Sequence, residues 1–126
     1  MFQIVPQLTV KDLERSRKFY CENLGFSVMQ ADPPEAPIFV ALEREDAQVF
    51  LVSEQSREEV NLKELSANKR GVGVRIYVEV DDAKAVYDSL SRVGVEINRD
   101  IAYNEDEDYT EFSFLDPDGY EIGMYS

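Results

Sequence analysis

The sequence has no histidine and only one cysteine, Cys21. Without histidine, a Ser-His-Asp or Cys-His nucleophile is excluded, and so is imidazole ligation of zinc. A carboxylate-only metal site stays open on these grounds. One cysteine cannot form an internal disulfide, which is typical of proteins in a reducing cytoplasm.

Long apolar runs are also missing. No stretch approaches the ~18 to 20 apolar residues of a membrane span. The first ten residues, MFQIVPQLTV, lack the charged start and small-residue cleavage site of a secretory signal. The sequence therefore predicts a cytoplasmic protein with no membrane partner. Its 126 residues, 44% of them hydrophobic, fit a single folded domain.

Basic residues are scarce relative to acidic ones. There are 13 Lys and Arg against 26 Asp and Glu, which gives a formal net charge of −13. Sequence-independent binding to nucleic acid depends on Lys and Arg, so we expect no nucleic-acid partner. Such a surface attracts positively charged ligands. The alternative is that the acidity serves solubility alone.

The sequence does contain an internal repeat. Residues 4–26 and 74–95 each hold a β-type stretch ending in valine, then an aspartate at a helix N-cap position, Asp12 or Asp82. An amphipathic helix and a glycine stop follow in both copies. Strand-like segments follow each helix, at 26–31, 37–43 and 47–53 in the first copy and at 95–101, 109–115 and 120–125 in the second.

The repeat predicts an α+β fold of two tandem β-α-β-β-β modules, residues 1–54 and 71–126. A linking helix is expected over 55–70, with Ser56 and Glu59 as its capping box. In each module one helix covers one sheet face and leaves the other face free. Two such modules can join into a concave, partly closed mixed sheet, whose open side is the expected ligand site.

Three stretches resemble the vicinal oxygen chelate superfamily, also called the glyoxalase, bleomycin-resistance and dioxygenase group. They read PQLTVKDLERSRKFYCENLGF, IYVEVDDAKAVYDSLSRVGV and FLDPDGYEI. The resemblance implies paired modules and a homodimer built from exchanged or abutting modules. It also implies that catalytic members hold a divalent metal with four inward side chains, usually His, Glu or Gln, from the first and last strands of each module.

At the matching positions this chain has Val5, Arg75, Gly123 and a residue near Leu51. These residue types do not form a hard-cation site, and a guanidinium repels a cation. The resemblance therefore points to the metal-free, bleomycin-resistance-like branch, with no cofactor and no catalytic residue. Members of that branch sequester bulky antibiotics that are often cationic and aromatic. The alternatives are another small organic ligand, or catalysis of the lyase, isomerase or dioxygenase type.

Strand alternation predicts which side chains face the open side of the sheets. In the first strand it places Ile4 toward the helix and the polar residues Gln7 and Thr9 on the open side. The predicted ligand-binding set is Gln7, Thr9, Arg75, Tyr77, Glu79, Glu121, Gly123 and Tyr125. Arg75 is expected to pair with a glutamate or to clamp an anionic group of the ligand. The tyrosines are expected to stack on a planar ring or a cation.

The stretch YNEDEDY, residues 103–109, concentrates four acids between two tyrosines. We predict a solvated loop between strands. The alternative is a flexible acidic lip that attracts cationic ligands to the mouth of the pocket.

Overall fold

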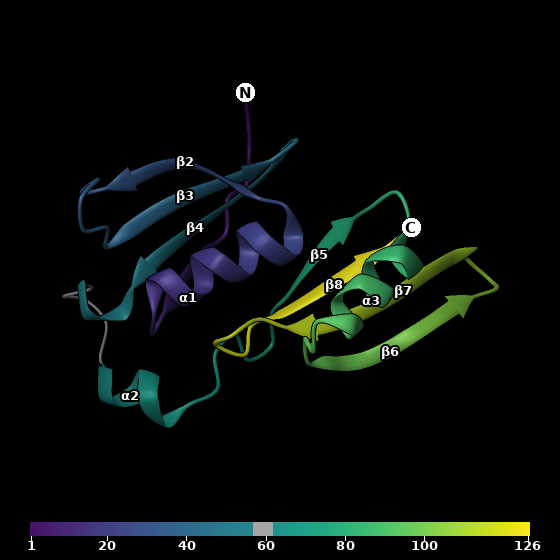
Figure 1. The fold of residues 1–126 in the computed structure, drawn as a ribbon. Helices are drawn as coiled ribbons and strands as arrows, with labels where there is room; N and C mark the ends of the chain where they lie inside the picture. The colour runs from purple at the N-terminus through teal and green to yellow at the C-terminus, as the bar shows by residue number, and fades with distance from the viewer. Residues whose placement is uncertain (57–61) are drawn as a thin grey trace. The chain divides into compact units, whose positions relative to one another are not determined.

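A computed structural model describes residues 1–56 and 62–126 of the chain. The chain divides into two compact units, Met1–Asn68 and Lys69–Ser126. Each unit contains one four-stranded mixed sheet and a helix that packs against it (Figure 1).

The sheet of the first unit has the strand order β1-β4-β3-β2. Its strands are β1 (Gln7–Val10), β2 (Ser27–Asp32), β3 (Phe39–Arg44) and β4 (Ala47–Ser53). β1 runs parallel to β4, and the other neighbours are antiparallel. The helix between β1 and β2 starts as α1 (Leu13–Lys18) and continues as a π-helical turn, η1 (Phe19–Asn23).

Local sequence signals define both ends of this helix. The side chain of Asp12 accepts a hydrogen bond from the backbone N–H of Arg15 at 3.0 Å, as expected for an N-cap. Gly25 adopts a φ of +72° just after the last turn, and the N–H of Phe26 donates back to the carbonyl of Tyr20 at 3.1 Å. The core beneath the helix includes Leu8, Val10, Tyr20, Leu24, Val40, Leu42 and Leu51.

The second unit repeats this arrangement with the strand order β5-β8-β7-β6. Its elements are β5 (Arg75–Glu79), α3 (Ala83–Arg92), β6 (Ile97–Asn104), β7 (Tyr109–Leu115) and β8 (Glu121–Tyr125). β5 runs parallel to β8, and the last three strands form an antiparallel meander. The predicted α+β fold of two β-α-β-β-β modules is confirmed.

The stretch for which a linking helix is expected begins with a short 3₁₀ turn, η2 (Glu54–Ser56), and later contains α2 (Leu62–Ala67). Residues 57–61, among them Glu59 of the expected capping box, lie outside the described residues.

The first strand starts later than the sequence predicts. β1 begins at Gln7, and Ile4, expected to face the helix, is 85% exposed. Pro6 explains the difference, because it has no N–H to donate to a ladder and so favours the end of a strand. Its carbonyl accepts the first hydrogen bond from Phe50, at 2.9 Å.

The acidic stretch of residues 103–109, predicted to be a loop, comprises the end of β6, a turn and the first residue of β7. Its tip is a turn over residues 105–108, all of them exposed. The side chain of Asn104 accepts a hydrogen bond from the N–H of Glu107 at 3.0 Å, and Asp108 has a positive φ of 54°. The hydroxyl of Tyr103 donates to the Asp108 carboxylate.

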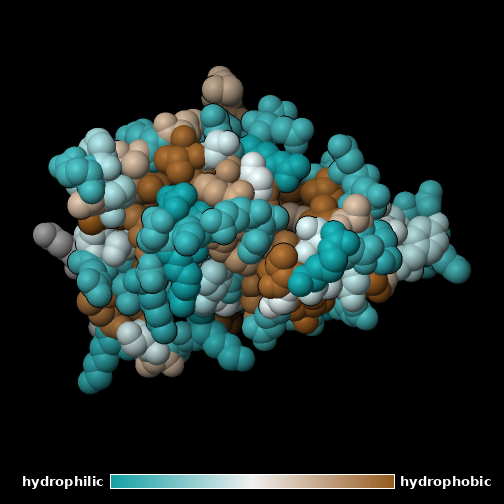
Figure 2. Space-filling model, in the orientation of Figure 1, coloured by the Kyte–Doolittle hydropathy of each residue, from teal (hydrophilic) through white to brown (hydrophobic). Residues whose placement is uncertain are grey.

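Hydrophilic side chains cover much of the face drawn in Figure 2, as expected from the 26 acidic and 13 basic residues. Within the part of the chain that the structure describes, no helix has both the length and the apolar character to cross a membrane.

Candidate functional site

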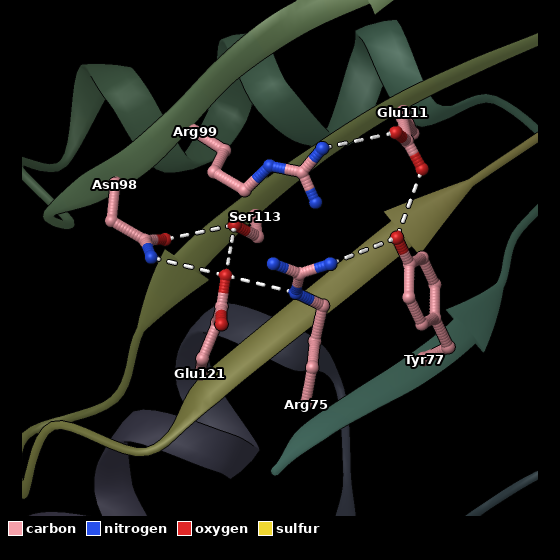
Figure 3. Close-up of polar contacts among 7 residues, drawn as sticks. All are labelled: Arg75, Tyr77, Asn98, Arg99, Glu111, Ser113 and Glu121. Atoms are coloured by element: carbon pink, nitrogen blue, oxygen red, sulfur yellow. Dashed lines mark hydrogen bonds and ion pairs between the residues drawn. The ribbon is translucent and has the colours of Figure 1, made fainter. Parts of the chain in front are cut away.

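The second sheet presents one apolar and one polar face. Buried Phe112, Phe114, Ile122 and Met124 point to the side covered by α3, where the ring of Phe112 contacts Tyr87 edge-to-face at 5.4 Å. Residues that alternate with them therefore point to the opposite face. This open face, which we call the polar face, carries Arg75, Tyr77, Asn98, Arg99, Glu111, Ser113 and Glu121 (Figure 3).

An ion pair lies at the centre of the polar face. β5 and β8 pair in the register that places Arg75 beside Glu121. The Nε of Arg75 is 2.9 Å from Oε2 of Glu121, and both side chains are partly exposed, at 32% and 21%. The pair is therefore formed where solvent or a ligand can reach it.

Glu121 is held from a second side as well. The Ser113 hydroxyl lies 2.8 Å from Glu121 Oε2 and 2.9 Å from Asn98 Oδ1, and Asn98 Nδ2 donates to the same carboxylate at 3.1 Å. Ser113 itself is completely buried. Three donors therefore converge on one carboxylate oxygen, as Figure 3 shows.

These donors keep Glu121 ionised. Burial by itself raises the pKa of Glu121, but the hydrogen bonds from Ser113, Asn98 and Arg75 outweigh it and hold the pKa below its ordinary value. The hydrogen bond to Glu121 likewise raises the pKa of Arg75 against a smaller opposing effect of burial. The centre of the polar face is therefore a charged pair.

A second carboxylate joins the same network through a tyrosine. The hydroxyl of Tyr77 donates to Oε2 of Glu111 at 3.0 Å and accepts from Nη1 of Arg75 at 3.3 Å. Arg99 bonds the other oxygen of Glu111 at 3.3 Å. Arg75 thus contacts Glu121 directly and Glu111 through the Tyr77 hydroxyl.

Tyrosine rings line the other end of the polar face. Tyr77 and Tyr125 meet at a centroid distance of 5.8 Å, and Tyr125 meets Tyr109 at 6.3 Å, both edge-to-face. The guanidinium of Arg75 lies 5.6 Å from the centre of the Tyr77 ring. Glu79, exposed, pairs with Tyr125 in the strand register. Rings with a nearby carboxylate are the surroundings that attract a cation.

Gly123 makes room for this arrangement. It pairs with Tyr77 in the register of β5 and β8. A Cβ atom at Gly123 would lie 3.1 Å from Cδ of Arg75 and 3.1 Å from Cε1 of Tyr77. A glycine in the middle of a strand weakens it unless another group needs the space. Here the Arg75 and Tyr77 side chains take that space.

A cleft of about 960 Å³ adjoins the polar face in the second unit. The glycine-containing segment before β5 contributes residues 69–74, and the sheet contributes Arg75, Asn98 and Glu121. The size is within the ~300 to 1,000 Å³ of small-molecule sites. The central ion pair therefore forms part of the wall of a cavity that can hold a ligand.

The structure brings together the second-unit members of the predicted set. Arg75, Tyr77 and Glu79 on β5 and Glu121, Gly123 and Tyr125 on β8 share the polar face. The two other predicted residues, Gln7 and Thr9, lie on β1 of the first unit, where they pair with Phe50 and Val52.

Sequence reasoning missed Asn98, Arg99, Glu111 and Ser113. The alternation in β7, where Glu111 and Ser113 flank apolar Phe112, signals the two β7 residues. No comparable signal exists for β6, because its pairing with β7 shifts register on both sides of Arg99. Such irregularities break the strict alternation on which the prediction depends.

The strand register also identifies the first-unit counterpart of Gly123, which is expected near Leu51 from the sequence. Leu51 pairs with Leu8 and is fully buried on the helix side of the sheet. The residue of β4 that corresponds to Gly123 is Phe50, which pairs with Gln7. Phe50 contacts Phe39 edge-to-face at 5.3 Å, so this position carries an aromatic side chain.

The residues at the expected metal positions do not fit a divalent cation. In the second unit one is the guanidinium of Arg75, and the other is Gly123, whose side-chain space is filled by Arg75 and Tyr77. The nearby carboxylate of Glu121 is already bonded to Arg75. Divalent cations require oxygen, nitrogen or thiolate ligands, which neither position supplies. Across residues 1–56 and 62–126, no three His, Cys, Asp or Glu side chains gather as a metal site.

The family model of the Glyoxalase/Bleomycin resistance protein/Dioxygenase superfamily matches residues 3–124. The chain belongs to this superfamily. A curated relative, a catechol-2,3-dioxygenase of Bacillus subtilis (strain 168), is 32% identical over 122 residues, which are 95% of this chain. Those residues are 39% of the relative, so the chain spans well under half of its length.

Solved structures show the same fold at low sequence identity. A superfamily member from Sphaerobacter thermophilus DSM 20745 has a TM-score of 0.74 and 22% identity, over 99% of this chain and 96% of the other. Lactoylglutathione lyase from Agrobacterium tumefaciens has a TM-score of 0.73 and 12% identity, over 98% and 92%.

The lowered pKa of Glu121 predicts an acid-dependent contribution to stability. A carboxylate whose pKa is lower in the folded state stabilises the fold above its unfolded pKa, and this stabilisation is lost as pH falls through the folded pKa. We therefore expect Glu121→Gln to cost stability at pH 7 and progressively less below the ordinary pKa of 4.5. Urea unfolding of both proteins from pH 7 to pH 3 measures the difference.

Glu79→Gln is the matched control, because it removes a carboxylate from the same face that takes no part in the Ser113, Asn98 and Arg75 contacts. A difference between Glu121→Gln and the unaltered protein that stays constant over this pH range would contradict the role of those hydrogen bonds.

Proposed function

We propose that this chain binds a small organic molecule without a metal ion, on the polar face and in the adjoining cleft. Binding of this kind protects by stoichiometric sequestration, as in bleomycin-resistance-type proteins. The observation that carries the proposal is Gly123, because the space of a metal-binding side chain is taken there by Arg75 and Tyr77. The resemblance adds a homodimer to the proposal, and the single cysteine adds a cytoplasmic location.

The chemistry of the polar face suggests an aromatic, cationic ligand. Tyr77 and Tyr125 offer rings for stacking, and the exposed residue Glu79 pairs with Tyr125 in the strand register. The net charge of −13 favours the approach of a cation. Gln7 and Thr9 on β1 stay proposed ligand-binding residues of the first unit.

An enzyme of the lyase, isomerase or dioxygenase type is the second candidate. The 32% identical relative named as a catechol-2,3-dioxygenase favours it. Metal content separates the two candidates, since a metal-dependent member holds about one divalent ion per site. Elemental analysis of protein purified without chelator is expected to find no stoichiometric divalent ion. One ion per chain would favour the enzyme and contradict metal-free binding.

The binding proposal predicts a defined effect of Tyr77→Ala. We expect the aromatic cation naphthalen-2-ylmethylammonium to bind the full chain and to shift the backbone amide signal of Gly123 in ¹H–¹⁵N NMR spectra. Loss of the Tyr77 ring is expected to weaken binding by roughly 2- to 30-fold, which corresponds to the ~0.5 to 2 kcal/mol of a cation–π contact.

Tyr103→Ala is the control for this experiment. Tyr103 is also an exposed tyrosine of the second unit, but it lies beside the β6–β7 turn and bonds Asp108 there. Equal weakening by both variants, or binding that leaves the Gly123 signal in place, would contradict a site on the polar face.

A further inference from the structure

We infer that Arg75 acts as a built-in cation where the fold would otherwise hold a metal ion, and that the ligand presents a planar carboxylate to it. This inference rests on the proposed function and specifies the ligand further. It follows from how Arg75 is held, from which of its donors are left over, and from the charge of the cleft beside it.

Arg75 is held in place on three sides. Its Nε bonds Glu121 at 2.9 Å, its Nη1 bonds the Tyr77 hydroxyl at 3.3 Å, and its Cδ lies over Gly123. A guanidinium carries five N–H donors in a rigid plane. Two of them are used in these contacts, and Figure 3 draws no hydrogen bond or ion pair from Nη2. The remaining donors are available to a ligand.

Glu121 does not cancel this role. Its Oε2 accepts hydrogen bonds from neutral Ser113 and Asn98 as well as from Arg75, so Arg75 is not the only group that stabilises this carboxylate. A ligand carboxylate can therefore bond the outer edge of the Arg75 guanidinium while Glu121 keeps its place. If the ligand displaces the Arg75–Glu121 contact, Ser113 and Asn98 still satisfy Glu121.

The cleft reduces the repulsion that an anion meets elsewhere on this protein. Three basic and three acidic residues line it, Lys69, Arg70, Arg75, Glu96, Asp118 and Glu121. The lining is formally neutral, whereas the whole chain has a net charge of −13. A planar guanidinium can donate two parallel hydrogen bonds to a carboxylate, so we assign the anionic group of the ligand as a carboxylate.

The two ends of the polar face then select opposite charges. Arg75 and Glu79 are four residues apart on β5, which at ~3.3 Å per residue separates them by roughly 13 Å. The tyrosines lie between and beside them. A ligand with an aromatic body, a carboxylate at the Arg75 end and a cationic group at the Glu79 end matches this order of side chains.

Three probes that share a naphthalene ring and carry an anionic, a neutral or a cationic substituent test the inference. The ¹⁵N-labelled full chain is titrated with naphthalene-2-carboxylate, with the neutral naphthalene-2-carboxamide and with naphthalen-2-ylmethylammonium, at constant ionic strength. The backbone signal of Gly123 and the Arg75 Nε–H signal report binding. We expect the carboxylate to bind about 10-fold more tightly than the carboxamide, as one charge-assisted hydrogen bond provides.

Variants assign this preference to Arg75. Arg75→Gln is expected to remove the preference for the carboxylate, and Arg75→Lys, which keeps the charge but lacks the planar fork, to retain only part of it. Arg92→Gln is the matched control, because it makes the same change in charge in the last turn of α3 and is expected to keep the full preference. If Arg75→Gln does not fold, the Arg75→Lys result decides.

The outcomes separate the inference from the proposed function. Equal affinity for the carboxylate and the carboxamide, or a preference that survives Arg75→Gln or is undiminished in Arg75→Lys, overturns the anion site and leaves metal-free binding intact. If none of the three probes binds, the proposed function fails, and this inference fails with it.

Discussion

Replacement of Arg70 by methionine is expected to lower the free energy of unfolding by about 3 kcal/mol, the typical cost of removing one partner from a buried ion pair. The Nη1 of Arg70 lies 3.7 Å from Oδ1 of Asp118, and the two side chains are only 4% and 0% exposed. Without the guanidinium, the Asp118 carboxylate stays buried but loses its compensating charge.

The pair connects the segment before β5 to the turn between β7 and β8. In that turn the Asp116 carboxylate accepts hydrogen bonds from the N–H groups of Asp118 and Tyr120, at 3.0 and 2.9 Å. Beside Arg70, a Cβ at Gly71 would come within 2.9 Å of the Tyr120 ring. Loss of Arg70 therefore disturbs the two segments that border the cleft.

Urea unfolding followed by far-UV circular dichroism measures this effect. Lys69→Met, which also removes one positive charge but at the exposed neighbouring residue, is expected to alter stability by no more than about 0.5 kcal/mol. The double variant Arg70→Met with Asp118→Leu is expected to recover part of the loss, because it removes both charges. Equal effects of Arg70→Met and Lys69→Met would contradict a stabilising buried pair.

Introduction of glutamate at Gly123 is expected to destabilise the protein by about 1 to 3 kcal/mol, the usual cost of overpacking a filled site. The new Cβ would meet Arg75 and Tyr77 at 3.1 Å, and the rest of the side chain needs the space that they fill. The Arg75–Glu121 contact is expected to break, and binding of the naphthalene probes to be lost.

Gly123→Ala separates crowding from the effect of the carboxylate. It adds only the Cβ, which the partly exposed Arg75 side chain can accommodate by a small shift, so we expect a smaller loss of stability. Unfolding in urea and the same NMR titrations measure both variants. A Gly123→Glu protein that keeps full stability and the Arg75 Nε–H signal of the unaltered protein would show that Arg75 is not held by packing over Gly123.

Much of the second unit could be predicted because its signals are local. Asp82 caps α3 as expected, with its side chain accepting from the N–H of Ala85 at 3.1 Å. The alternation in β5 and β8 gave the correct face for Arg75 and Glu121, since a slip of one residue would put charges beneath α3. For segments with clear caps and strict alternation, the helix ends and the facing of strand side chains can therefore be predicted from the local sequence.

Predictions failed where a neighbour along the sheet decides the outcome. Register shifts in the pairing of β6 with β7 hide Asn98 and Arg99. The late start of β1 has a local cause instead, the missing N–H of Pro6. The partnership of Arg70 with Asp118 joins residues far apart in sequence, and neither position has a local pattern that indicates it.

By itself, the sequence determined what chemistry is absent: it has no imidazole, and it has arginine and glycine where the superfamily's metal ligands are expected. Only the tertiary structure decided which side-chain contacts form at those positions instead. Parallel pairing of β5 with β8 brings Arg75 and Tyr77 over Gly123, and β6 and β7 supply the donors that keep Glu121 charged. The physical reason is that strand register depends on non-local backbone hydrogen bonds, and side-chain alternation within one strand does not specify its neighbours.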